Sequence, residues 1–133
     1  MADTFRLKII SPTGVFFDGD VERFVVRGTE GEFAILAKHT PFTTTLALGT
    51  FHILFGEGKK KSGTLLGGLA TINSHETIVL TEAAEWPEDI DLERAKEAKE
   101  RALQRLKDSQ YDAVRAQVAL QRAIIRISTK ENH

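Results

Sequence analysis

The sequence predicts an all-β sandwich of about ten strands, followed by a C-terminal antiparallel hairpin of two helices. All ten Gly and all three Pro lie within residues 1–87, whereas residues 88–133 contain neither. Because Gly and Pro favour turns and are costly inside helices, the second part is expected to be helical. The first part alternates short β-branched and aromatic runs with turn residues, which is typical of an all-β unit. We therefore predict a sandwich over 1–87 and a helical hairpin over 88–133.

The strands are expected in chain order, each bounded by turn residues. Residues 5–9 alternate apolar and polar side chains, as a strand with one buried face does. Further strands are expected at 15–17, 21–26, 33–36, 41–48, 51–55, 64–72 and 77–81, with turns at 11–14, 18–20, 28–31 and 56–58. Gly67-Gly68 interrupts one run and indicates a bulge or a close backbone approach. Because no long helical pattern separates the strands, the sequence argues against a parallel α/β sheet.

The second part is expected to fold back on itself. Pro87 lies where a helix can begin soon afterwards, and the acidic residues that follow suit the positive end of a helix dipole. A first helix is indicated by apolar residues at helical spacing: Leu92, Ala95, Ala98, Ala102 and Leu106. The turn is expected at 107–110 and the second helix at about 111–128. Because the apolar stripes are rich in Ala, they bury little area, and we expect a hairpin that needs another surface.

The composition excludes several classes of function. The chain of 133 residues is 41% hydrophobic and 28% charged, which suits one globular protein. It has no Cys, which excludes disulfides, thiolate zinc sites and cysteine nucleophiles. Its net charge of −1 argues against nucleic acid as a partner, and no apolar run is long enough for a membrane span. The sequence contains no enzyme motif, and its four His are not spaced as metal ligands are, so we predict no catalytic residue and no metal site. Without a membrane span or a signal peptide, we expect a soluble cytoplasmic protein.

The informative residues are arginines on the two expected helices. Arg94 and Arg101 lie seven residues apart, on nearly the same face of the first helix. In the second helix, spacings of seven and four place three arginines within about 40° of one line: Arg115, Arg122 and Arg126. If the helices pack antiparallel, the end near Asp91 lies beside the end near Arg126. Arg94, Arg122 and Arg126 could then converge.

Converging guanidinium groups are suited to a phosphorylated ligand, because each binds phosphate through paired hydrogen bonds. In such a site, Glu85 and Asp91 are candidates for contacts with ribose hydroxyls, with an amine, or with the arginines themselves. The pattern of charged residues therefore allows a nucleotide site at the open end of the hairpin.

Salt bridging within the first helix is the simpler alternative, with Asp91 paired to Arg94 and Glu97 to Arg101. Such exposed pairs contribute only about a few tenths of a kcal/mol. Residues 109–130, however, hold one acidic residue against four basic ones. Their arginines therefore need an anion outside their own helix, and both an anionic ligand and an acidic protein surface remain open.

Four segments in order resemble the epsilon subunit family of bacterial F-type ATP synthases. The first, GEFAILAKHTPF, resembles the family's GELGILPGHxP segment, and the others resemble its SGG-hydrophobic segment, its last strand and the start of its helical domain. They cover residues 31–42, 67–69, 79–85 and 88–95. Their order, spacing and total length make the resemblance specific over the whole chain. It implies a flattened β-sandwich followed by a two-helix hairpin, as the residue pattern does.

The resemblance implies a non-catalytic rotor subunit of the central stalk that helps couple proton transport to ATP synthesis. Its sandwich would lie against the gamma subunit and the c-subunit ring, peripheral to the cytoplasmic face of the cell membrane. Glu32 and His39 match the family's contact loop and are the implied candidates for c-ring or gamma contact. Ala37-Lys38 replaces the family's usual Pro-Gly, so the shape of this loop does not follow from the resemblance.

The resemblance also implies that the hairpin is a mobile regulator. Folded down, it would permit ATP hydrolysis; extended, it would inhibit hydrolysis by reaching the beta and alpha subunits of the catalytic head. A weakly packed hairpin suits this role, because a modest difference in contacts can switch it. The implied inhibitory contacts are Arg115, Arg122 and Arg126.

Bacillus-like members carry an ATP-binding motif, I/L-D-x-x-R-A, which residues 90–95 (IDLERA) match in full. ATP is implied as a regulatory ligand of the compact hairpin, with magnesium possible, and not as a substrate. The implied ATP-binding residues are Glu85, Ile90, Asp91, Arg94, Ala95, Arg101, Arg122 and Arg126. The alternative is an inhibitory interaction module of the same complex that binds no nucleotide.

Overall fold

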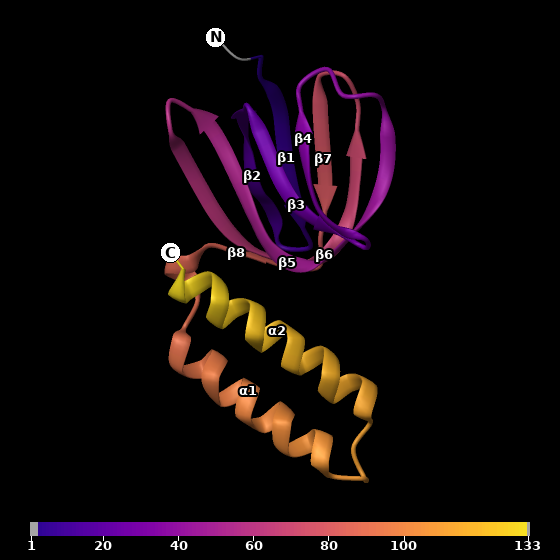
Figure 1. The fold of residues 1–133 in the computed structure, drawn as a ribbon, viewed down its shortest axis with the longest axis vertical. Helices are drawn as coiled ribbons and strands as arrows, with labels where there is room; N and C mark the ends of the chain where they lie inside the picture. The colour runs from indigo at the N-terminus through magenta and orange to yellow at the C-terminus, as the bar shows by residue number, and fades with distance from the viewer. Residues whose placement is uncertain (1–2, 133) are drawn as a thin grey trace. The chain divides into compact units, whose positions relative to one another are not determined.

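The computed structural model describes residues 3–132, and the chain divides into two compact units after Ala84. The first unit is built of strands and the second of helices (Figure 1). The compositional boundary predicted at Pro87 lies close to this division. Within the described range, no helix is long and apolar enough to cross a membrane.

The strand unit is a sandwich whose described strands are paired in the order β2-β1-β7-β6-β5-β3-β4, with β8 paired to β6. Their bounds are β1 (Phe5–Ser11), β2 (Gly14–Val21), β3 (Arg23–Gly28), β4 (Gly31–Leu36), β5 (Phe42–Gly56), β6 (Lys59–Ile72), β7 (Glu76–Leu80) and β8 (Ala84–Glu85). β1 runs antiparallel to β2 but parallel to β7. The parallel pairing joins two segments that lie far apart in the sequence.

Alternating side chains of the strands fill the core of the sandwich. Leu7 and Ile9 of β1 are fully buried, because successive side chains of a strand point to opposite faces. The ring of Phe51 lies 5.8 Å from that of Phe24 and 6.3 Å from that of Phe16. The remaining large, fully buried apolar side chains are Val21, Val26, Ile35, Ile53, Leu65, Ile72 and Val79. The core is therefore built of large aromatic and branched residues.

The predicted fold class is confirmed, but the strands are fewer and longer than expected. The two runs predicted at 41–48 and 51–55 form the single strand β5, and Figure 1 shows β5 and β6 as long, curved strands. Gly49 lies within β5, where a Cβ would sit 3.1 Å from the side chain of Arg27. This glycine therefore permits a close approach and does not end a strand.

The turn predicted at 18–20 is also wrong, because these residues continue β2. Arg6 of the neighbouring β1 donates a hydrogen bond from Nε to Asp18 at 2.7 Å, and its guanidinium lies 3.7 Å from Asp20. The hydrogen bond from Arg6 holds the pKa of Asp18 below its ordinary value. The cation on one strand thus accommodates two acidic residues on the exposed face of the next.

Gly67-Gly68 is a close backbone approach, as predicted. Both residues have positive φ, +78° and +146°. A Cβ on Gly68 would overlap the carbonyl oxygen of Leu80 on β7. Glycine is therefore required where β6 and β7 come together.

The helical unit consists of a 3-10 turn η1 (Pro87–Asp89), α1 (Leu92–Lys107) and α2 (Ala113–Glu131). Asp91 caps α1 by accepting a hydrogen bond from the backbone N–H of Arg94 at 3.2 Å. Asp112 caps α2 by accepting from Val114 N–H at 2.9 Å. Because Asp112 fixes this start, the turn between the helices lies at 108–112, slightly later than predicted. The buried seam consists of Ala95, Ala102, Ala116, Leu120 and Ala123.

Candidate functional site

The hairpin gathers arginines from both helices on one side. Arg101 and Arg105 line one hollow, Arg105 and Arg115 line the next, and Arg115 shares a third with Arg122 and Arg126. Arg94 precedes Arg101 by seven residues and so lies on nearly the same side of α1. We call this set the arginine face: Arg94, Arg101, Arg105, Arg115, Arg122 and Arg126. The row predicted on the second helix thus continues onto the first.

The third hollow, here the arginine groove, has a volume of about 430 Å³. It is lined by Ala98 of α1 and by Val114, Arg115, Val118, Ala119, Arg122 and Arg126 of α2. Alanine and valine side chains provide an apolar surface, and guanidinium groups border it. A groove of this kind can hold a ligand that has both an apolar ring and an anionic group.

At the open end of the hairpin, Arg126 is held by Glu85. Its Nε donates to Glu85 Oε1 at 2.6 Å, and the two side chains are only 31% and 26% exposed. Glu85 and Arg126, both candidates from the sequence, are thus in direct contact. Because water has limited access to this pair, its Coulomb attraction is screened less than that of an ion pair on an open surface.

A second bond at the same end was not foreseen. Lys130 Nζ donates to the backbone carbonyl oxygen of Pro87 at 2.9 Å. No sequence pattern indicated this contact, because every residue carries the carbonyl that accepts the bond. The helix periodicity indicates only that Lys130, one turn after Arg126, lies on the same side of α2.

The other candidates of the ATP motif lie near the start of α1. The Asp91 carboxylate acts as the helix cap, and Arg94 is exposed. Ile90 and Ala95 are each 5% exposed, so they pack inside the unit. Arg101 lines a hollow formed by α1 residues alone, separate from the arginine groove. The structure therefore does not bring all eight candidates into one cavity.

The intrahelical salt bridges considered from the sequence are not formed within the described range of 3–132. The Asp91 carboxylate contacts the backbone of Arg94 and not its guanidinium, and Glu97 and Arg101 make no ion pair there. In α2, Asp112 caps the helix start. Arg94 and Arg101 are thus not paired with the carboxylates of Asp91 and Glu97, although Glu97 and Glu100 line the same hollow as Arg101.

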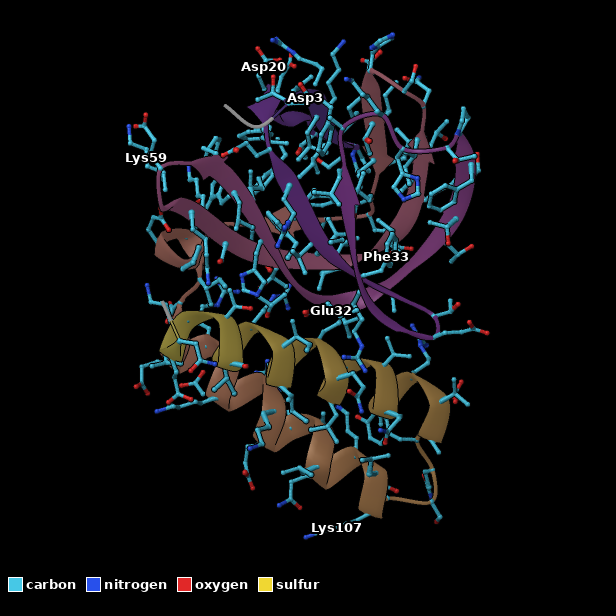
Figure 2. The ribbon with its side chains drawn as sticks, turned by 45° about the horizontal axis from the view of Figure 1, so that its top comes forward. Asp3, Asp20, Glu32, Phe33, Lys59 and Lys107 are labelled. Carbon is cyan, nitrogen blue, oxygen red and sulfur yellow. The ribbon has the colours of Figure 1, made fainter. Side chains whose placement is uncertain are left out.

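Of the two sandwich candidates, Glu32 lies on β4 and His39 lies in the loop after it. Glu32 is exposed near the start of the strand, at the turn from β3, whereas His39 follows the end of the strand. The His39 ring lies 5.0 Å from that of Phe42, and its Nδ1 is 3.1 Å from the Thr40 carbonyl oxygen. Figure 2 shows Glu32 well separated from Lys59 at the β5–β6 turn. The structure does not bring Glu32 and His39 together.

The loop that departs from the family pattern keeps a conformation that glycine favours. Lys38 has φ +60°, in the left-handed region, and its backbone N–H donates to the Ser74 carbonyl at 3.2 Å. Lys38 Nζ also lies 3.2 Å from Asp3. Lysine thus occupies a backbone position that suits the glycine of the family segment.

An apolar band on the outside of the sandwich was missed. Val15, Leu69 and Leu80 are 64%, 40% and 51% exposed. With Ile10 they follow one another across β2, β1, β7 and β6, since Ile10 is paired with both Val15 and Leu80, and Leu80 with Leu69. Two consecutive apolar residues in a strand point to opposite faces, so one of them must lie on the outside. The pairs Ile9-Ile10 and Val79-Leu80 were therefore the sequence signal for this outer band.

The described residues contain no group of three or more side chains that could hold a metal ion. His52 is partly buried, with Nδ1 2.6 Å from the Ser62 hydroxyl. Burial, and to a smaller extent the charge of Lys60, lowers the pKa of His52, while Glu32 acts in the opposite direction.

Two family models match the chain. One, described as the beta-sandwich domain of the ATP synthase delta/epsilon chain, matches residues 4–87, and the long alpha-helix domain of the same chain matches 88–131. A relative from Acetobacterium woodii, the "ATP synthase epsilon chain, sodium ion specific", is 68% identical over 132 residues, or 99% of each chain. The ATP synthase epsilon chain of Clostridium novyi is 44% identical and covers 96% of this chain and 98% of its own.

Solved structures share the fold. A chain of the Euglena gracilis mitochondrial ATP synthase has a TM-score of 0.83 at 24% identity, covering 98% of this chain and 82% of its own. A chain of the Tetrahymena thermophila mitochondrial ATP synthase central stalk and c-ring has a TM-score of 0.69 at 15% identity, covering 97% and 98%. The architecture is therefore retained at low sequence identity.

Proposed function

Because the chain belongs to the ATP synthase delta/epsilon chain family, we propose that it is a rotor subunit whose hairpin inhibits ATP hydrolysis when extended. ATP bound to the arginine face stabilises the compact hairpin and so opposes inhibition. The subunit itself has no catalytic role. ATP is a regulatory ligand, with magnesium as a possible companion.

The observation that best supports this proposal is the arginine groove beside a seam of alanines. The groove offers an apolar surface for a base and guanidinium groups for phosphates. The seam buries mostly methyl groups, so the energy that favours the compact hairpin is small. A ligand that binds only the compact hairpin stabilises it by RT ln(1 + [L]/Kd), which is enough to shift such a balance.

The residues of the open end have distinct roles in this proposal. Arg122 and Arg126 hold phosphate oxygens, with Arg94 contributing from α1. Glu85 restrains Arg126 until phosphate takes that guanidinium. Asp91 remains the cap of α1, while Ile90 and Ala95 maintain the packing beneath. Arg101 lies in a separate hollow that also holds Glu97 and Glu100, so we assign it no direct contact with the ligand.

When the hairpin is extended, the same arginines meet acidic protein surface. We expect Arg115, Arg122 and Arg126 to contact the beta and alpha subunits of the catalytic head. An excess of basic residues on α2 favours such contacts, because charges of opposite sign attract during docking. The arginine face thus serves one anionic partner in each state.

The sandwich supplies the contacts with the rotor. The apolar band of Val15, Ile10, Leu80 and Leu69 suits a protein interface, because such patches are uncommon on isolated proteins. We assign it and His39 to the gamma subunit, and the exposed turn of Glu32 to the c-subunit ring. The protein is then peripheral to the cytoplasmic face of the membrane.

Calorimetry of the purified chain with ATP tests the nucleotide site. We expect binding to the natural chain and at least about tenfold weaker binding in Arg126→Ala and Arg122→Ala, which lose phosphate contacts. Lys107→Ala, which removes an exposed cation at the other end of α1, is the matched control. Equal affinity in all four proteins would overturn the site.

If ATP neither binds nor raises the unfolding temperature of the natural chain, the alternative function holds. The chain is then an inhibitory interaction module without nucleotide binding. Removing residues 88–133 should increase ATP hydrolysis by the assembled enzyme in either case. An unchanged hydrolysis rate after that deletion would contradict inhibition by the hairpin.

One relative bears on which ion the enzyme transports. The resemblance implied proton transport, whereas the relative from Acetobacterium woodii is named sodium ion specific. Because that relative is 68% identical over nearly the whole chain, we propose that this chain serves a sodium-coupled enzyme. ATP hydrolysis by the complete enzyme should then rise with sodium at constant pH. A rate that is independent of sodium would favour the proton.

A further inference from the structure

The linker that precedes α1 is contacted at two points by the end of α2. Arg126 Nε donates to Glu85 Oε1 at 2.6 Å, and Lys130 Nζ donates to the Pro87 carbonyl oxygen at 2.9 Å. All four residues belong to the helical unit. The two bonds are thus internal to that unit.

The spacing of the two bonds follows from the geometry of both segments. Arg126 and Lys130 are four residues apart on α2, which separates them by about 6 Å along the same side of the helix. Glu85 and Pro87 are two residues apart, and Trp86 between them is extended, with φ −80° and ψ 152°. Two steps of extended chain measure about 6.6 Å, so Glu85 and Pro87 are about as far apart as Arg126 and Lys130. The two segments therefore match in repeat length.

The surroundings of the bonds restrict the access of water. Pro87 is buried, Ile90 is 5% exposed and Thr129 is 3% exposed. The Pro87 carbonyl also accepts from the backbone N–H of Ile90 at 3.1 Å, which closes the turn η1. A hydrogen bond from an ammonium group in such a place is stronger than one in open water.

We propose that Lys130 and Arg126 form a clasp that holds the linker on α2 and keeps the hairpin compact in the absence of nucleotide. This inference deepens the proposed function, on which its role in inhibition rests. Arg126 is shared between Glu85 and the phosphate of the proposed ligand. Lys130 is not shared, so its bond to Pro87 persists in both conditions. The clasp therefore sets how much the hairpin resists extension once ATP has left.

Hydrogen exchange of the full chain without nucleotide tests the clasp. The reporters are the amides of Asp89 and Ile90, which donate to the carbonyls of Trp86 and Pro87. Lys130→Met keeps the length of the side chain and removes its donor. We expect both amides to exchange about fivefold faster in this variant, because the turn opens more often.

Two further variants separate the clasp from general effects of charge. Lys107→Met is the matched control, since Lys107 is exposed and lies in the last turn of α1 (Figure 2). Lys130 lies in the last turn of α2 in the same way. It should leave the exchange of Asp89 and Ile90 unchanged. Lys130→Arg should restore slow exchange, because a guanidinium can also donate to a carbonyl.

Equal exchange of these amides in Lys130→Met and Lys107→Met overturns the clasp. Faster exchange in Lys130→Met that Lys130→Arg does not reverse also overturns it, because the donor would then be irrelevant. Since the measurement contains no nucleotide, a failure of ATP to bind the natural chain disproves the nucleotide site and leaves the clasp intact.

Discussion

The sandwich and the hairpin are stabilised by very different cores. The sandwich buries Phe24, Phe51 and a set of Leu, Ile and Val side chains completely. The seam of the hairpin contains four alanines and Leu120. Because stabilisation grows by about 25 cal/mol for each Å² of apolar surface buried, the two units differ greatly in stability per residue. A well-packed unit can act as a fixed base, and a weakly packed one can change its state.

The largest effect is expected where the sandwich is most densely packed. Phe51→Ala removes a fully buried ring that contacts Phe24 and Phe16. We expect the free energy of unfolding of the sandwich to fall by about 3–5 kcal/mol. Urea unfolding followed by circular dichroism measures it. If Phe51→Ala lowered the free energy of unfolding by less than Leu120→Ala does, the sandwich core would not be the better packed of the two.

A smaller effect, confined to the hairpin, is expected from Leu120→Ala. Leu120 is the largest residue of the seam and is 8% exposed. Its truncation should cost about 2 kcal/mol, and helical circular dichroism should then be lost before the sandwich unfolds. Val118→Ala, on the same helix and 44% exposed, is the control and should cost less than about 0.5 kcal/mol. A single transition in which both units unfold together would contradict this separation.

Lys38→Gly should make the sandwich slightly more stable. The left-handed conformation of Lys38 costs about 1 kcal/mol, and the greater freedom of glycine in the unfolded chain costs about 0.5 kcal/mol. The net gain in the free energy of unfolding is therefore about 0.5 kcal/mol. Loss of the exposed pair with Asp3 matters little. Thr40→Gly, at a position without positive φ, should destabilise, and a gain there would refute the explanation.

The smallest expected effect is a change in the stability of the sandwich with pH. Burial lowers the pKa of His52, so the unfolded chain binds a proton more readily than the folded one. The contribution of His52 to stability is therefore complete above its ordinary pKa of 6.5 and declines as the pH falls below that value. Urea midpoints across this range should show the decline, and His52→Gln should reduce it. His75→Gln, at an exposed turn, is the control. An identical pH profile in His52→Gln would exclude this histidine as the cause.

The division into strands and helices was accessible from the sequence because Gly and Pro are confined to one part of it. The helix ends were also nearly correct, since Asp91 caps α1 where the pattern begins. The strand ends were less accessible. Two strands were predicted at 41–48 and 51–55, but Gly49 between them continues one strand, in close approach to Arg27 of another strand. Residues 18–20 looked like a turn, but Arg6 holds them in a strand.

The site was predictable only in part. Helical spacing placed Arg115, Arg122 and Arg126 on one line, and these three do line one groove. The pairing of Arg126 with Glu85 spans 41 residues, so no local pattern indicates it. Arg101 lies in a hollow formed by α1 residues alone, and the sequence did not separate it from the groove, which is built mainly of α2 residues.

The parallel pairing of β1 with β7 has a consequence for the order of folding during synthesis. Residues 6–10 pair with the nearby β2, but they find their second partner strand only at 76–80, so the sandwich cannot close until most of its chain has left the ribosome. Closing so long a loop is slow compared with joining two neighbouring helices. The hairpin is made last and needs only local contacts. The hairpin can therefore form without waiting for the sandwich to close.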